Sequence, residues 1–174
     1  WDYQTIQPAR VANRRGLLTH PAWLIAHAQN TETDPVIRGK WIREKLLAGT
    51  VPDVPISVDA VIPEDHSKTL RHRLAQATET DYCWKCHRHM NPLGYAFEQY
   101  DDFGRYRDKE SLEYPDKLIS KGPEQRGNHL IDTRDVFETL PVETRGELEG
   151  TGDDSLDGQV AGAMDLAERL AKSE

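Results

Sequence analysis

Apolar residues recur at helical spacing in several stretches of the chain, and each stretch predicts one helix. The stretches are residues 21–29, 35–48, 64–77, 95–100 and 156–172. Thr19 precedes the first as a candidate N-cap, and Asp34-Pro35 supplies a cap and a first-turn proline to the second. The pattern therefore predicts about five helices.

The segments between these helices favour loops and short strands. Residues 50–63 contain three prolines, which remove backbone donors and predict an extended connector. Residues 105–150 are rich in glycine, proline and charge, with β-like pieces at 130–131 and 136–137. The predicted fold class is mainly α, with additional N-terminal helices and a loop-rich region that contains a small β-hairpin.

Composition narrows the class of protein. The 174 residues suit one sizeable domain or two small ones. The net charge of -8 argues against nucleic-acid binding, which needs a basic face. No apolar run reaches the length of a membrane span. We expect a globular chain that binds no nucleic acid and has no membrane span.

The chemistry concentrates in Cys83-Trp84-Lys85-Cys86-His87, which holds both cysteines of the chain. A CxxC spacing is typical of a redox dithiol, half a zinc site, a disulfide or haem attachment. The histidine that follows favours haem, because two thiols can reach the two vinyl groups while the imidazole binds iron. The sequence predicts one covalent haem c on Cys83 and Cys86, with His87 as the proximal iron ligand.

The alternative is a zinc site. It would use both cysteines and some of His87, His89 and His129. Structural zinc usually takes a second pair of ligands at regular spacing, and the chain has no further cysteine. Haem is therefore the favoured interpretation.

The residues after the motif would complete the pocket. The carbonyl of Pro92, or that of a neighbour, is predicted to accept a hydrogen bond from Nδ1 of His87 and to orient the ring. Aromatic side chains would form the apolar walls. These are Trp84, Tyr95, Phe97, Tyr100 and Phe103.

The sixth iron ligand is left open between several residues. Met90 follows His87 too closely to reach the opposite face of the macrocycle, and Met164 lies on an apolar stripe typical of core packing. His27 is the preferred distal ligand and His20 the next, since both share the apolar stripe of the first predicted helix. His66 is a third upstream histidine, and an open or water-bound iron is the remaining alternative.

Several blocks of the sequence resemble a known family. They are Arg15 to His20, Asp34 to Trp41, Cys83 to His87, Asn91 to Gly94 and Tyr100 to Arg105. Together they resemble the cytochrome c-like domain of large multidomain planctomycete proteins of unknown function. Residues 144–152 and 156–158 resemble part of the short C-terminal domain that follows it. Ala77 departs from the family, which often has a histidine shortly before the motif.

The resemblance implies a cytochrome c-like haem core over residues 1–110 and a C-terminal extension over 111–174, with the terminal helix packed on the core. Only Cys83, Cys86 and His87 carry over as functional residues. It also implies haem c, electron transfer and export to the periplasm or an equivalent bacterial compartment, where haem c is attached.

The leading functional hypothesis is single-electron transfer by a carrier that is not an enzyme. The alternative is a haem enzyme or gas-binding module with an open iron, peroxidase-like or a sensor. The expected partners are a redox protein or other domains of a larger polypeptide. The acidic net charge favours a basic partner.

Overall fold

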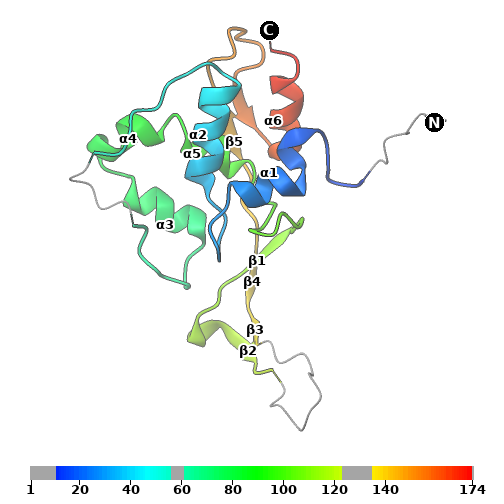
Figure 1. The fold of residues 1–174 in the computed structure, drawn as a ribbon. Helices are drawn as coiled ribbons and strands as arrows, with labels where there is room; N and C mark the ends of the chain where they lie inside the picture. Colours follow the sequence, from blue (N-terminus) through cyan, green and yellow to red (C-terminus); the bar gives the residue numbers. More distant parts are fainter. Residues whose placement is uncertain (1–10, 56–60, 123–134, 174) are drawn as a thin grey trace, which may run out of the picture.

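The computed structural model describes residues 11–55, 61–122 and 135–173. The N-terminal elements are η1 (Leu17–Thr19), α1 (Pro21–Ala26), α2 (Pro35–Lys45), α3 (Leu70–Ala77), α4 (Asp81–His87) and α5 (Asn91–Tyr95). They are followed by β1 (Lys109–Ser111), η2 (Pro115–Lys117), β2 (Leu118–Ser120), β3 (Val136–Phe137), β4 (Thr139–Pro141), β5 (Gly146–Leu148), β6 (Gly158–Val160) and α6 (Ala163–Leu170). Figure 1 shows the helices gathered in one body, from which β1 to β4 project as an arm.

The predicted mainly α fold class, a cytochrome c-like core with added helices, is wrong. Of the described residues, only 35% are helical and 14% are in strands or bridges. The described residues form six α-helices and three two-stranded antiparallel sheets, β1–β4, β2–β3 and β5–β6. Each strand has two or three residues, too few for an alternating pattern to be recognised in the sequence. The β-like piece at 136–137 is strand β3, and the piece at 130–131 lies outside the described residues.

The first two helices begin where their capping chemistry places them. The Asp34 carboxylate accepts from the backbone N–H of Ile37 at 2.9 Å, which confirms the predicted start of α2. The predicted cap of α1 by Thr19 is wrong. Nδ1 of His20 accepts from the Ala22 amide at 3.2 Å, while Thr19 is buried and donates to the carbonyl of Arg15.

Helices α1 and α2 end about three residues before their predicted ends, and two other predicted helices begin later than expected. Helix α3 begins at Leu70 rather than at residue 64, because the Thr69 hydroxyl caps it by accepting from the His72 amide at 3.2 Å. Helix α6 begins at Ala163, because the preceding residues pair as strand β6 with β5. The aromatic run at 95–100 begins at the last residue of α5 and continues as turns rather than forming a helix of its own.

The hydrophobic core joins both ends of the chain. Fully buried side chains of the N-terminal part pack with others from β5, β6 and α6. They include Leu24, Ile42, Phe97, Leu148 and Leu166. The part of the chain after residue 110 therefore completes the core on which the upstream helices pack. Among the described residues, no helix is both long enough and apolar enough to cross a membrane.

Helices α2 and α5 approach each other at two glycines. A Cβ on Gly39 would lie 1.9 Å from the carbonyl oxygen of Met90, and one on Gly94 would lie 1.8 Å from that of Pro35. Only a residue without Cβ fits at either position, so this contact holds the start of α5 in place. Because Met90 and α5 directly follow the CxxCH segment, the contact also fixes the position of that segment.

We expect Gly39→Ala to destabilise the fold by about 1–3 kcal/mol, because the new methyl group forces the two backbones apart. Urea unfolding followed by circular dichroism measures the loss. Lys45→Ala, at an exposed position of the same helix, is the control and should change stability little. Equal stability of Gly39→Ala and Lys45→Ala would contradict the proposed close contact.

Candidate functional site

Helix α4 carries the CxxCH motif. The Thr80 hydroxyl caps it by accepting from the Cys83 amide at 3.4 Å. Cys83, Cys86 and His87 are spaced three and four residues apart, so they share one face of this helix. Both cysteines are half-buried free thiols. The helix therefore presents two thiols and an imidazole side by side on one surface.

A chain of hydrogen bonds holds the ring of His87. Nδ1 of His87 lies 2.9 Å from Oδ1 of Asn91, and the Asn91 amide donates to Oγ1 of Thr78 at 3.2 Å. The Thr78 hydroxyl in turn donates to the carbonyl of Leu74 at 2.8 Å. Asn91 is fully buried and Thr78 nearly so. This network joins the end of α4 to α3 and α5.

The network also sets the tautomer of His87. A carbonyl can only accept, so the Thr78 hydroxyl donates to Leu74 and accepts from the Asn91 amide nitrogen. The Asn91 side-chain oxygen then faces His87 and accepts from Nδ1–H. The neutral ring keeps its lone pair on Nε2, the atom available to bind a metal.

Asn91 takes the role that we predicted for a backbone carbonyl near Pro92. The Pro92 carbonyl instead faces Gly146 of β5, where a Cβ would lie 2.2 Å from it. Asn91 was not among the site residues predicted from the sequence. Its position four residues after His87 is the signal that could have found it, because residues at that spacing meet on a helical surface.

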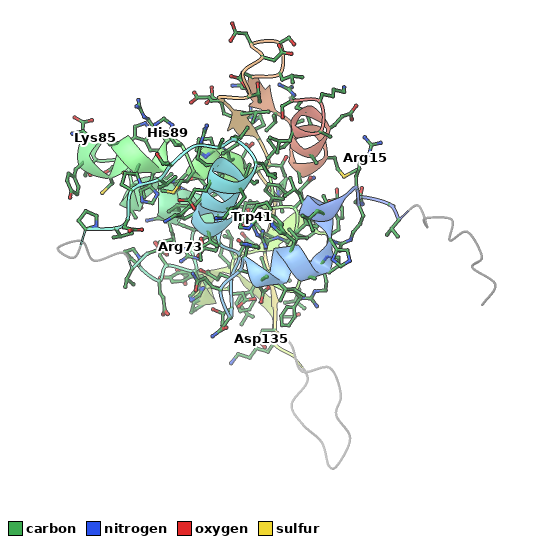
Figure 2. All side chains as sticks on the ribbon, turned by 45° about the horizontal axis from the view of Figure 1, so that its top comes forward. Arg15, Trp41, Arg73, Lys85, His89 and Asp135 are labelled. Carbon is green, nitrogen blue, oxygen red and sulfur yellow. The ribbon has the colours of Figure 1, made fainter. Side chains whose placement is uncertain are left out.

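The two predicted distal histidines lie elsewhere. His20 is exposed at the start of α1, and Nδ1 of His27 donates to the Trp23 carbonyl at 2.7 Å. The His27 ring packs 5.5 Å from the ring of Trp41, which Figure 2 shows near the middle of the molecule, away from Lys85 on α4. Figure 1 places α2 and α5 between α1 and α4. The structure therefore does not bring His20 or His27 to the CxxCH helix.

The remaining candidates are also spread over the fold. Met90 is buried against α2, and Met164 is half-buried on α6. His66 is exposed and lines a polar cleft of about 400 Å³ beside the start of α3. Of the predicted aromatic walls, Phe97 and Tyr100 lie in the core, whereas Phe103 is 60% exposed. Trp84 and Tyr95 are the two that lie beside α4 and line a common cavity.

The donor set of the site fits a haem better than a single ion. Within residues 11–55, 61–122 and 135–173, no three His, Cys, Asp or Glu side chains group as ligands of one metal. Haem c makes no such demand, since the thiols bond to the porphyrin edge and only the imidazole binds iron. A preset His87 tautomer beside two free thiols meets that requirement. His129, a member of the zinc alternative, lies outside the described residues.

Helix α4 and its buried support lie within the part of the chain that matches a family model. Residues 14–110 match the family model PSCyt3, described as a protein of unknown function (DUF1588). The chain belongs to this planctomycete-specific family of cytochrome-like domains. Comparison with curated proteins found no match, and comparison with solved structures found none.

Proposed function

We propose that the chain carries one covalent haem c and transfers single electrons. Cys83 and Cys86 would form the thioethers, and Nε2 of His87 would bind the iron. The observation that carries the proposal is the buried network from His87 through Asn91 and Thr78, which engages Nδ1 of His87 and leaves Nε2 as the ring nitrogen free to bind iron. A histidine on the surface without a metal does not need a buried side-chain amide to fix its tautomer. A histidine that binds a metal benefits from such an amide, because it orients the ring.

Each residue of the network has a defined part in this function. The haem supplies the one-electron couple. Asn91 holds the His87 ring in one orientation. Nε2 of His87 would therefore keep its position when the haem gains or loses an electron. Because the Asn91 amide is a neutral hydrogen-bond acceptor, it gives the His87 imidazole less anionic character than a carboxylate would, so the imidazole is a moderate electron donor to the iron. Thr78 keeps the Asn91 amide from rotating.

An optical spectrum of the oxidised and dithionite-reduced protein, with a pyridine haemochrome, tests the proposal directly. One c-type haem per chain would support it. A colourless protein that contains zinc would refute it. The preparation should come from an extracytoplasmic compartment, where we propose that the haem is attached.

Asn91 offers a sharper test of the site. We expect Asn91→Asp to lower the reduction potential, because a carboxylate at this position gives the imidazole more anionic character and stabilises oxidised iron. The expected change is roughly tenfold in the redox equilibrium, about 59 mV for one electron. Spectroelectrochemical titration measures it. Asn30→Asp, at an exposed loop position, adds the same charge and should leave the potential nearly unchanged.

A second candidate function is ligand binding or peroxide chemistry at an open iron. It is favoured by the position of His20 and His27, which lie with α1 beyond α2 and α5. An iron held by His87 alone would bind carbon monoxide when reduced and show high-spin bands. Sharp low-spin bands that carbon monoxide does not alter would exclude this function and favour the electron carrier.

We propose a redox protein, or another domain of a longer polypeptide, as the electron partner. The net charge of -8 favours a basic partner surface. The rate of electron exchange should then fall as salt screens the attraction. Stopped-flow exchange with a basic and an acidic cytochrome at two salt concentrations would compare the partners.

A further inference from the structure

A cavity of about 440 Å³ lies beside the CxxCH helix. Its lining includes Arg71 of α3, Trp84 of α4 and Tyr95 of α5. Two acidic residues, Glu143 and Glu147, also line it, together with Pro92, Arg145, Gly146 and Gln159. Trp84 stands between the two cysteines in the sequence, so the cavity adjoins the proposed attachment segment. It also lies where the family-matched residues 14–110 meet strand β5.

Arg71 is a partly buried cation without a carboxylate partner in the described structure. Its guanidinium stacks 4.1 Å from the centre of the Tyr95 ring, and Nη1 donates to the Arg145 carbonyl at 2.7 Å. The carboxylate of Glu143, which is nearby, is taken by Arg145 through two bonds of 3.0 and 3.1 Å. Burial lowers the pKa of the Arg71 guanidinium. A desolvated cation of this kind is stabilised by an incoming anion.

Tyr95 adds an unused donor to the same cavity. Its side chain is only 7% exposed; the Asn91 side chain lies close to its hydroxyl oxygen, but no group of the described residues accepts a hydrogen bond from its O–H. Burial raises the pKa of the phenol to about 12, so the hydroxyl keeps its proton at neutral pH. A buried, protonated and unpaired hydroxyl is costly unless a ligand supplies the acceptor. Arg71 and Tyr95 therefore offer one positive charge and one O–H to the same ligand.

We propose that this cavity binds a carboxylate, and that the carboxylate is a propionate of the haem attached at Cys83 and Cys86. The inference rests on the proposed function. Covalent attachment would hold the propionates in the same molecule, so they would outcompete carboxylates from solution through their high effective concentration. Arg71 pairs with the carboxylate charge, and the Tyr95 hydroxyl donates to one of its oxygens.

The test compares full-length haem-loaded variants. Arg71→Gln is expected to lower the reduction potential by roughly a tenfold change in the redox equilibrium, about 59 mV, and to shift the propionate band in the resonance Raman spectrum. Tyr95→Phe should shift the same band, and Arg71→Lys should restore part of the potential. Arg88→Gln is the matched control. It removes an exposed arginine next to His87 that lies outside the cavity, so the propionate band should stay unchanged.

Three outcomes separate this inference from the proposed function. A wild-type protein without haem would refute both. A normal haem whose propionate band is the same in Arg71→Gln and Tyr95→Phe would overturn the propionate site alone. Calorimetric titration with succinate distinguishes the source of the carboxylate. Binding of succinate to the haem-loaded protein that disappears in Arg71→Gln would show an open anion site and overturn the propionate assignment.

Discussion

Replacing both thiols, Cys83→Ser and Cys86→Ser together, is expected to give a protein that retains no haem after denaturation. The serine hydroxyls cannot form thioethers with the vinyl groups, so any remaining haem is held only through His87 and by packing. Haem staining of the denatured protein, with a pyridine haemochrome of the native one, measures the loss. We expect the double variant to contain no covalently bound haem.

The fold supplies the control for this experiment. Neither cysteine is fully buried and neither forms a disulfide, so serine costs little packing and the apoprotein should fold. Circular dichroism of the double variant should match that of wild-type apoprotein produced without haem attachment. Single variants should each keep haem through one thioether. Full haem staining in the double variant would show that attachment does not use these residues.

Replacing His87 separates attachment from ligation. His87→Ala keeps both thiols but removes the proximal ligand, and it leaves the Asn91 oxygen without its donor. We expect haem that is covalently bound but has lost its low-spin bands, with partial return when imidazole is added. A variant whose spectrum equals that of wild type would place the iron ligand on another residue.

The motif was predictable because its chemistry is local. CxxCH occupies consecutive positions, and the spacing alone places Cys83, Cys86 and His87 on one helical face. The supporting residues are less local. Asn91 could have been found from its distance to His87, but Thr78 is tied to Asn91 only through the packing of α3 against α5. No periodicity in the sequence records that contact.

The fold was less predictable for a physical reason. A strong capping signal can be recognised in the sequence, and Asp34-Pro35 correctly predicted where α2 begins. The sheets pair short strands that are distant in sequence, such as Glu110 with Leu140, and that pairing depends on tertiary contacts. The stripe at 156–172 was interpreted as one helix, although its first part is strand β6. Tertiary pairing overrode local preference there.

The distal histidines show the limit of reasoning from one helical stripe. His27, the C-cap residue of α1, packs against Trp23 as the spacing predicts, with the ring centroids 4.8 Å apart. A stripe indicates that a residue faces inward but not which neighbour it meets. Here the neighbour is Trp41 of α2. Only the tertiary arrangement shows that α2 and α5 lie between this face and α4.

Arg38 is a buried support of the fold that was not predicted from the sequence. It is fully buried on α2, and its guanidinium donates to five backbone carbonyls. These belong to Leu24, His27, Phe97, Tyr100 and Asp101. An arginine on an otherwise apolar face gives no sequence signal, because charged side chains are seldom fully buried. The guanidinium joins α2 to the end of α1 and to the segment after α5.

We expect Arg38→Met to lower the free energy of unfolding by at least about 3 kcal/mol, because several buried carbonyls lose their donor at once. Methionine fills a similar volume, so the loss reports hydrogen bonding rather than a cavity. Arg38→Lys keeps the positive charge, but the lysine ammonium cannot donate to carbonyls on both sides of the guanidinium position. We expect this variant to recover only part of the free energy of unfolding. Urea unfolding followed by tryptophan fluorescence measures all three proteins.

The matched control for Arg38→Met is Lys45→Met, which makes a similar change at an exposed position of the same helix and should alter stability by less than about 0.5 kcal/mol. Both variants lie on α2, lose one positive charge and introduce methionine. The difference between their stabilities therefore reports the effect of burial at position 38. If both variants unfold at the same urea concentration, the carbonyl network does not hold the helices together. If only Arg38→Met loses stability, its buried guanidinium joins α2 to the end of α1 and to the segment after α5, and the same variant should also loosen the native structure around α5.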